Sequence, residues 1–301
     1  MITELPMLRE GKRGSYMIGN FIHKDQIMQF KIWEEEIFQE VRTHGRGIYD
    51  ATVVGSEYGR VYLTVKAITH CEDPAVNASY FLPSLDPKIN TQIYQRAKTT
   101  LLANGADPGT FALAEKILTW PGFEGRFFIE GAAMRHHDNI IGGLAHHSYK
   151  MLDILATVLT NTPALRPSSD LLVLGVLLHD IGKIFEYNNL GPGDYWFANH
   201  RVRGIEVLAQ FKDEIIAFRD EYFYRQLQAI IMGHHGDYGD RPTTVATAIV
   251  HYIDTLESQV TGFVEDMVYG PEGERVKGGD WGYLEPLAVD RHDQITPTDI
   301  G

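Results

Sequence analysis

Histidines and carboxylates that could hold a metal ion gather in the second half of this sequence. Nine of the thirteen histidines lie between His136 and His251. Imidazole nitrogens and carboxylate oxygens together suit divalent transition metals such as Mn²⁺, Fe²⁺ and Zn²⁺. This clustering therefore indicates a metal site rather than histidines scattered over a surface.

The most informative pair is His179-Asp180, which follows an almost continuous apolar stretch at residues 171–178. Such a stretch predicts a buried helix, so the pair would lie in the interior. A buried carboxylate is costly unless it is paired or bound to a metal. The pair is therefore either a ligand pair or a tightly satisfied structural pair.

Further histidines and aspartates occur at separate points of predicted helices. In chain order the set is His147, His179, Asp180, His200, His234 and Asp254, with His235 directly after His234. Because one carboxylate can bridge two ions, the set supplies enough ligands for two metals. We expect one or two divalent ions, with Mn²⁺ as the first choice and Fe, Ni, Co, Zn or Mg as alternatives.

The ordered set resembles the HD-domain metal-dependent phosphohydrolases, and most closely the YhaM-type 3′–5′ exoribonucleases. GLAHH, LLHDIGK and HYID are among the motifs that carry the resemblance. They lie in five stretches, at residues 127–152, 174–186, 198–208, 230–242 and 248–258. The resemblance implies an N-terminal OB-fold joined to a C-terminal helical HD domain.

The resemblance also implies a role for each matching residue. His147 would be the first metal ligand, with His146 as the less favoured neighbour, and Asp180 would bridge two ions. The other implied ligands are His179, His200, His234 and Asp254.

The implied substrate chemistry involves residues around these ligands. His235 would be a ligand or a substrate contact, and Lys183 would reach the scissile phosphate. An imidazole could protonate the leaving oxygen because it titrates near neutral pH, and the candidates are His235, His136 and His137. The predicted catalytic residues are thus Lys183, His235 and Asp180, and the predicted substrate contacts are His136, His137 and Arg203.

The elements that must position these residues fall into two halves. Residues 1–75 have a mostly β pattern, with predicted strands at 37–41, 47–54 and 60–69, the last two forming a hairpin. From residue 87 the apolar spacing becomes helical. The predicted helices are residues 90–104, 108–118, 140–159, 169–187, 200–211, 222–233 and 243–267.

We therefore predict an α+β protein. Its expected parts are a small β-rich, OB-like domain at 1–85, a helical linker region at 86–130, an all-α HD bundle at 131–268 and an irregular tail at 269–301. The 301 residues are 44% hydrophobic, which excludes a mainly disordered chain. The sequence has no long apolar run and no apolar leader, and Cys71 is its only cysteine. We therefore expect a cytoplasmic protein that is not bound to a membrane.

The negative charge is unevenly spread. Of the net −13, residues 1–130 contribute −2 (14 basic, 16 acidic) and residues 131–301 contribute −11 (13 basic, 24 acidic). Proteins that grip nucleic acid through its phosphates are usually basic. Any nucleic acid must therefore meet a local patch here, or metal ions that offset the carboxylates.

Our leading hypothesis is a metal-dependent phosphodiesterase, a 3′–5′ exonuclease on single-stranded RNA or DNA. The β-rich domain would hold the strand against aromatic side chains such as Trp33, Tyr58 and Tyr62. The alternative is an HD-type nucleotidase or (d)NTP phosphohydrolase, which the charge favours because a mononucleotide needs no basic channel. A third hypothesis is a regulatory or binding module whose HD site has become a sensor or scaffold. The complete set of six ligands argues against it. We also consider a homo-oligomer, since a ring can form a channel that one acidic chain cannot.

Overall fold

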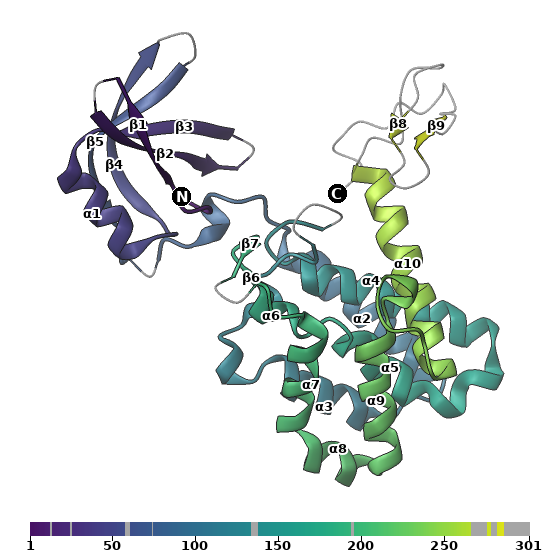
Figure 1. The fold of residues 1–301 in the computed structure, drawn as a ribbon. Coiled ribbons are helices and arrows are strands. Elements are labelled where there is room, and N and C mark those ends of the chain that lie inside the picture. Colours follow the sequence, from purple (N-terminus) through teal and green to yellow (C-terminus); the bar gives the residue numbers. More distant parts are fainter. Residues whose placement is uncertain are drawn as a thin grey trace.

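The computed structural model describes residues 1–12, 14–24, 26–57, 61–73, 75–133, 138–193, 196–265, 276–277 and 282–285. A β-rich module at the N-terminal end stands beside a larger body of helices (Figure 1). The predicted α+β class is confirmed. Within the described residues, no helix has the length and apolar character needed to cross a membrane.

The module is a five-stranded sheet with the order β1-β2-β3-β5-β4. Its strands are β1 (Met7–Gly11), β2 (Gly14–His23), β3 (Gln26–Ile32), β4 (Tyr49–Glu57) and β5 (Val61–His70). The predicted β4–β5 hairpin is confirmed, with Tyr49 opposite His70. Sequence patterns missed the first three strands. Among the described strands of this sheet β3 and β5 pair in parallel, since α1 and β4 lie between them in the chain and return it to the same direction.

The strand predicted at 37–41 is wrong, because these residues lie inside the helix α1 (Glu35–His44). Phe38 and Val41, three residues apart, form its buried face against the sheet. Acidic side chains begin the helix and basic ones end it, which favours the helix dipole. A five-residue window was too short to separate this helical spacing from a strand.

The module has a hydrophobic core of its own. Buried side chains alternate along the strands, so Phe30 and Ile32 of β3 face the core while Lys31 between them does not. The core residues are Ile2, Met17, Phe30, Ile32, Phe38, Val41, Val65 and Ile68.

The helical body follows. Its helices are α2 (Pro87–Ala103), α3 (Pro108–Leu118), α4 (Gly143–Asn161), α5 (Ser169–Leu178), α6 (Lys183–Glu186), α7 (His200–Gln210), α8 (Lys212–Phe218), α9 (Glu221–Gly233) and α10 (Val245–Glu265). The predicted helix at 169–187 is in fact two helices with a turn between them, and α8 was not predicted. Helices α2 and α3 each start at an aspartate cap followed by proline, a strong local start signal.

Short elements complete the chain. These are the 3₁₀ turns Ala78–Tyr80, Pro121–Phe123, Arg126–Phe128, Pro163–Ser168 and Gly236–Tyr238, and the two-residue strands β6 (Tyr187–Asn188), β7 (Gly191–Pro192), β8 (Val276–Lys277) and β9 (Tyr283–Leu284). The β6–β7 hairpin reaches the module, where Arg46 donates to the carbonyl of Pro192. Of the predicted irregular tail, the structure describes only β8, β9 and their immediate neighbours, and these two strands pair.

Helix α5 is the centre of the body. Nine of its ten residues are buried, and α3, α4, α9 and α10 pack around it. Residues of α2 and α3 belong to the same core, including Leu101 and Phe111. The helices predicted as a linker region therefore pack as part of the helical body.

The two separate cores lead to a prediction about stability. Replacing the fully buried Phe30 with alanine should destabilise the module by about 3–5 kcal/mol through lost burial and a cavity. Urea unfolding followed by far-ultraviolet circular dichroism, and by fluorescence in a background where Trp33 is the sole tryptophan of the four, should show the module transition shifted and the helical transition in place. Ile27→Ala, at a side chain 65% exposed, is the control. A shift of both transitions together would contradict independent cores.

Candidate metal centre

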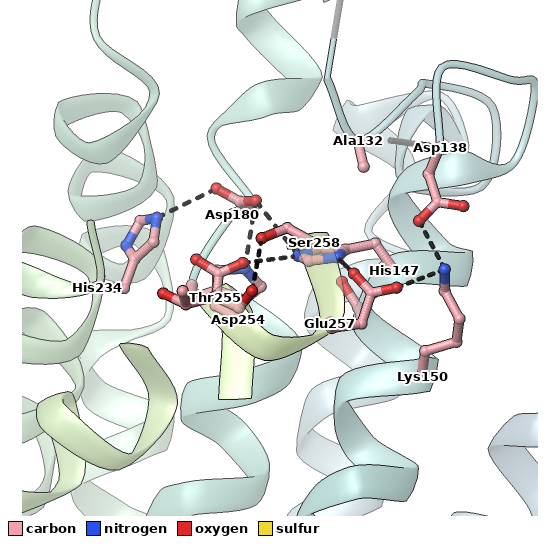
Figure 2. A network of polar contacts seen from close by, with 12 residues as sticks. Ala132, Asp138, His147, Lys150, Asp180, His234, Asp254, Thr255, Glu257 and Ser258 are labelled. Carbon is pink, nitrogen blue, oxygen red and sulfur yellow. Dashed lines mark hydrogen bonds and ion pairs between the residues drawn. The ribbon is translucent and has the colours of Figure 1, made fainter. Parts of the chain in front are cut away.

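The structure brings the six predicted ligands together from five places in the helical body. His147 comes from α4, His179 and Asp180 from the turn after α5, and the others from α7, α9 and α10. Five of the six are buried, and the Asp254 side chain is 19% exposed. Figure 2 shows Asp180 between His234 on one side and His147 with Asp254 on the other.

The two oxygens of Asp180 face different histidines. Oδ1 lies 3.3 Å from Nε2 of His234 and 3.5 Å from Nε2 of His200. Oδ2 lies 3.2 Å from Nε2 of His179 and 4.0 Å from Nε2 of His147. Two groups of candidate ligands therefore share this one carboxylate, which is the arrangement needed for a bridge between two ions.

Asp254 belongs to the second of these groups. Its Oδ1 lies 3.2 Å from Nε2 of His147, and its ligand atom also lies within 4.8 Å of those of His179 and His234. One group is thus His147, His179, Asp180 and Asp254, and the other is Asp180, His200, His234 and His235.

A close contact between the turn after α5 and the start of α7 fixes the position of Asp180 against His200. A Cβ atom on Gly182 would lie 1.8 Å from the backbone oxygen of His200, so no other residue fits there. The Asn199 side chain caps α7 by accepting from the Arg201 amide, which places His200 in the first turn.

Backbone carbonyls orient two of the histidines. Nδ1 of His179 lies 2.8 Å from the Val176 oxygen, and Nδ1 of His234 lies 2.9 Å from the Ile231 oxygen. A carbonyl only accepts, so each Nδ1 carries the proton. Each Nε2 then presents a lone pair toward Asp180, as a metal ligand requires.

Carboxylates orient the other two. Glu257 contacts Nδ1 of His147, and Glu186 Oε2 lies 2.6 Å from Nδ1 of His200. Carboxylate–histidine pairs of this kind set the tautomer and raise the basicity of a metal-binding imidazole. Sequence analysis missed Glu186 and Glu257. For Glu257 a signal existed, since it lies three residues after Asp254 and hence on the same side of α10.

A lysine in turn holds Glu257. The ammonium of Lys150 contacts Glu257 and lies 2.9 Å from Oδ2 of Asp138, so the chain Asp138–Lys150–Glu257–His147 runs into the centre (Figure 2). The positive charge compensates two buried carboxylates. The contact with His147, and after it the charge of Lys150, lower the pKa of Glu257 to about 2 against the effect of burial, so Glu257 is ionised.

The buried donor atoms fit divalent metals. Nε2 of His179, Nε2 of His234 and Oδ1 of Asp180 are buried and make no hydrogen bond within the described residues. Buried polar atoms normally find partners, so such a cluster of inward-facing atoms suggests that ions complete it. Mixed imidazole and carboxylate donors suit Mn²⁺, Fe²⁺, Zn²⁺ and similar ions.

Asp180 is ionised in this setting. Burial by itself would raise its pKa, but the adjacent charge of Lys183 holds the pKa well below its usual range. Lys183 Nζ lies 2.6 Å from Asp180 Oδ2 and donates to the Ala132 oxygen at 2.6 Å. The predicted catalytic lysine therefore lies at the centre.

His235 also joins the centre. Its Nε2 lies 3.1 Å from Nε2 of His200, and its ligand atom groups with those of Asp180, His200 and His234. Burial, and then the neighbouring His234, lower the pKa of His235 to about 3, so its imidazole is neutral. A neutral ring suits the ligand role, and the proton-donor role stays a prediction for His235 as for His136 and His137.

The predicted substrate contacts are less well defined. His136 and His137 lie outside the described residues. Arg203 lies on α7 and donates to Glu206 at 2.8 Å, so its contact with substrate stays a prediction. His146, the less favoured alternative to His147, instead contacts Asn90 at 2.8 Å.

Comparison with known protein families agrees with this geometry. Residues 144–259 match the family model described as HD domain. The matched range contains all six candidate ligands together with Lys183, His235 and Glu257. The match supports an HD-domain phosphohydrolase, which is a metal-dependent hydrolase. No solved structure matches the chain.

A first prediction for the centre concerns metal binding. Mn²⁺ added to metal-stripped protein should raise the melting temperature, with about 2.7 kcal/mol of stabilisation at 100 times Kd. Asp180→Asn should weaken Mn²⁺ binding at least about tenfold, because both groups lose their shared charge. The matched control is Asp153→Asn, which removes a carboxylate of α4 that forms an ion pair with Arg96 outside the centre. An equal thermal shift in both variants would contradict the assignment.

A second prediction concerns the carboxylate behind His147. Glu257→Gln should reduce metal affinity or hydrolysis about 10- to 100-fold, because the imidazole loses its anionic partner. Isothermal titration with Mn²⁺ measures the affinity directly. Glu214→Gln, at the exposed partner of Lys116, should leave it unchanged. Wild-type affinity in Glu257→Gln would show that the pair serves only stability.

Proposed function

We propose that this protein is a metal-dependent phosphodiesterase that removes nucleotides from the 3′ end of single-stranded RNA or DNA. The direction of degradation and the comparison with YhaM-type exoribonucleases rest on the sequence resemblance. The broader assignment, to the metal-dependent hydrolases, rests on the HD-domain match and the two groups of candidate ligands.

The centre suits phosphodiester cleavage. Divalent ions, with Mn²⁺ as our first choice, supply an activated water and neutralise phosphoryl oxygens when bound. Asp180 would hold both ions, with His147, His179 and Asp254 on one side and His200, His234 and His235 on the other. The Lys183 ammonium adds a fixed positive charge next to Asp180, where negative charge develops on the phosphoryl group.

A cluster of aromatic and basic side chains on the sheet favours a strand over a mononucleotide. The ring centroids of Tyr16 and Trp33 are 4.8 Å apart. Lys31 Nζ lies 3.9 Å from the ring centroid of Tyr62 and 5.5 Å from that of Tyr16. These residues of β2, β3 and β5, with Trp33 just after β3, alternate with the core residues and so face away from the core.

Such a face has the chemistry that single strands need. Bases stack on aromatic rings, and a lysine among them attracts the backbone. Its positive charge comes from Lys31, so strand binding on this face would rest mainly on stacking against the aromatic rings. Of the three aromatics predicted from sequence, Trp33 and Tyr62 lie in this cluster, and Tyr58 lies outside the described residues.

The topology of the module supports an OB-fold, which we include in the proposal. The strand order β1-β2-β3-β5-β4, the parallel β3–β5 pair and a helix between β3 and β4 are features of that five-stranded barrel. OB-folds bind oligonucleotides on the face of strands 2 and 3, which here carries Tyr16 and Lys31.

One observation favours a second candidate, a nucleotidase or (d)NTP phosphohydrolase. Residues 131–301 carry a net charge of −11, and the metal ligands in them are buried. A small nucleotide can enter such a site without a basic channel. In that case the module would have a regulatory or assembly role.

The test is hydrolysis of a 5′-labelled single-stranded RNA with Mn²⁺, beside a panel of nucleotides. We expect a ladder of products shortened from the 3′ end, absent in Asp180→Ala. Cleavage of a mononucleotide with an inert oligonucleotide would instead establish the second candidate.

Variants of the sheet face sharpen this test. Trp33→Ala should weaken binding of single-stranded RNA by about 1–3 kcal/mol and leave hydrolysis of a short dinucleotide nearly unchanged. Met28→Ala, at another exposed side chain of β3, is the control. Equal affinity of the two variants for single-stranded RNA would contradict a role of the module in substrate binding.

A further inference from the structure

A cavity of about 740 Å³ lies on the helical body, between the linker before α2 and helices α2, α3 and α4. Its volume is within the usual range of small-molecule sites, about 300–1,000 Å³. Much of its wall is apolar, including Leu85, Leu118, Phe128 and Ile141. None of the metal ligands lines it.

Helix α4 separates this cavity from the metal centre. Gly142 and Tyr149, seven residues apart on one side of the helix, line the cavity, whereas His147 points into the centre. Residues two apart in an α-helix point about 200° apart, so Tyr149 and His147 lie on opposite sides. The cavity is thus a separate place on the molecule.

Two tyrosines and a glutamate supply its polar groups. Tyr94 and Tyr149 pack with their ring centroids 4.8 Å apart. The Tyr149 side chain is only 8% exposed, and its hydroxyl makes no hydrogen bond within the described residues. The hydroxyl is not among the fully buried polar atoms that lack a partner, so a polar group of a ligand in the cavity can reach it.

The glutamate is Glu115 on α3. Glu115 is an exposed residue, so its carboxylate lies at the rim of the cavity, and it forms no ion pair within the described part of the chain. It lies close enough to the two phenols that its charge, after burial, contributes to raising the pKa of Tyr94 to about 12. Both phenols therefore stay neutral, and the carboxylate of Glu115 is one of the two charged groups among the lining residues.

The lining determines the charge of a ligand. Besides Glu115 it contains Asp86, and it contains no lysine, arginine or histidine among the described residues. Phosphates and carboxylates would meet only like charge here. Aromatic faces attract cations, and the Tyr94 ring already has Lys98 Nζ 5.7 Å from its centroid, outside the lining.

We propose that this cavity binds a small organic cation with an aromatic or otherwise apolar body. The ammonium group would pair with Glu115, the free hydroxyl of Tyr149 would take part in a hydrogen bond, and the apolar wall would cover the body. This site is independent of the proposed nuclease activity.

The experiment is isothermal titration of metal-stripped, full-length protein with 2-phenylethylamine. We expect binding that is at least about tenfold tighter than that of 2-phenylethanol, which has a similar shape without the charge, and no binding of 3-phenylpropionate. Glu115→Gln should weaken binding of the amine at least about tenfold, and Tyr149→Phe should weaken it less.

Two control variants test whether the amine binds in this cavity. Asp180→Ala should leave binding of the amine unchanged, because the metal centre lies across α4. Glu214→Gln, which removes an exposed carboxylate outside the cavity, should also leave it unchanged. Absence of amine binding, equal affinity for the alcohol, or full affinity in Glu115→Gln would each overturn the proposal. Loss of nuclease activity in a separate assay would not affect it.

Discussion

A single buried carboxylate, that of Asp180, is the constraint on which the rest of the helical body depends. Its desolvation is unfavourable unless positive charge and ligand-like donors surround it. Lys183 and two pairs of histidines from four separate elements do so, with each carboxylate oxygen facing one pair. The apolar helix α5 positions this group in the interior, and the Gly182 contact brings α7 against it.

A second set of interactions determines what the histidines can do. Carbonyls or carboxylates hold Nδ1 of all four, so the Nε2 atoms all face Asp180. This orientation distinguishes a site prepared for metal ions from a chance cluster of histidines. Lys150 contacts none of the ligand atoms that face Asp180. It contributes indirectly, because it compensates the charge of Glu257 behind His147.

The β-rich module adds what the metal centre lacks. The centre is acidic and buried, whereas the outer face of the sheet carries aromatic rings around Lys31. Its core is separate, so the module can present this face without depending on the packing of the helices. In the proposed exonuclease the module would hold the strand, and the helical body would cut it.

The sequence by itself determined the candidate metal ligands and most helices of the body. The apolar run before His179-Asp180, the order of the six ligands and the caps of α2 and α3 are local signals, and the structure agrees with them. Tertiary structure decided the rest. The strands β1 to β3 depend on pairing with distant residues, and α1 became distinct from a strand only by packing Phe38 and Val41 on the sheet. Glu186 looks like an ordinary surface carboxylate in the sequence, and the spacing of Glu257 from Asp254 shows only that the two share a side of α10. Only the fold places them behind histidines 14 and 110 positions away, because contacts at such separations follow from packing and leave no periodic pattern.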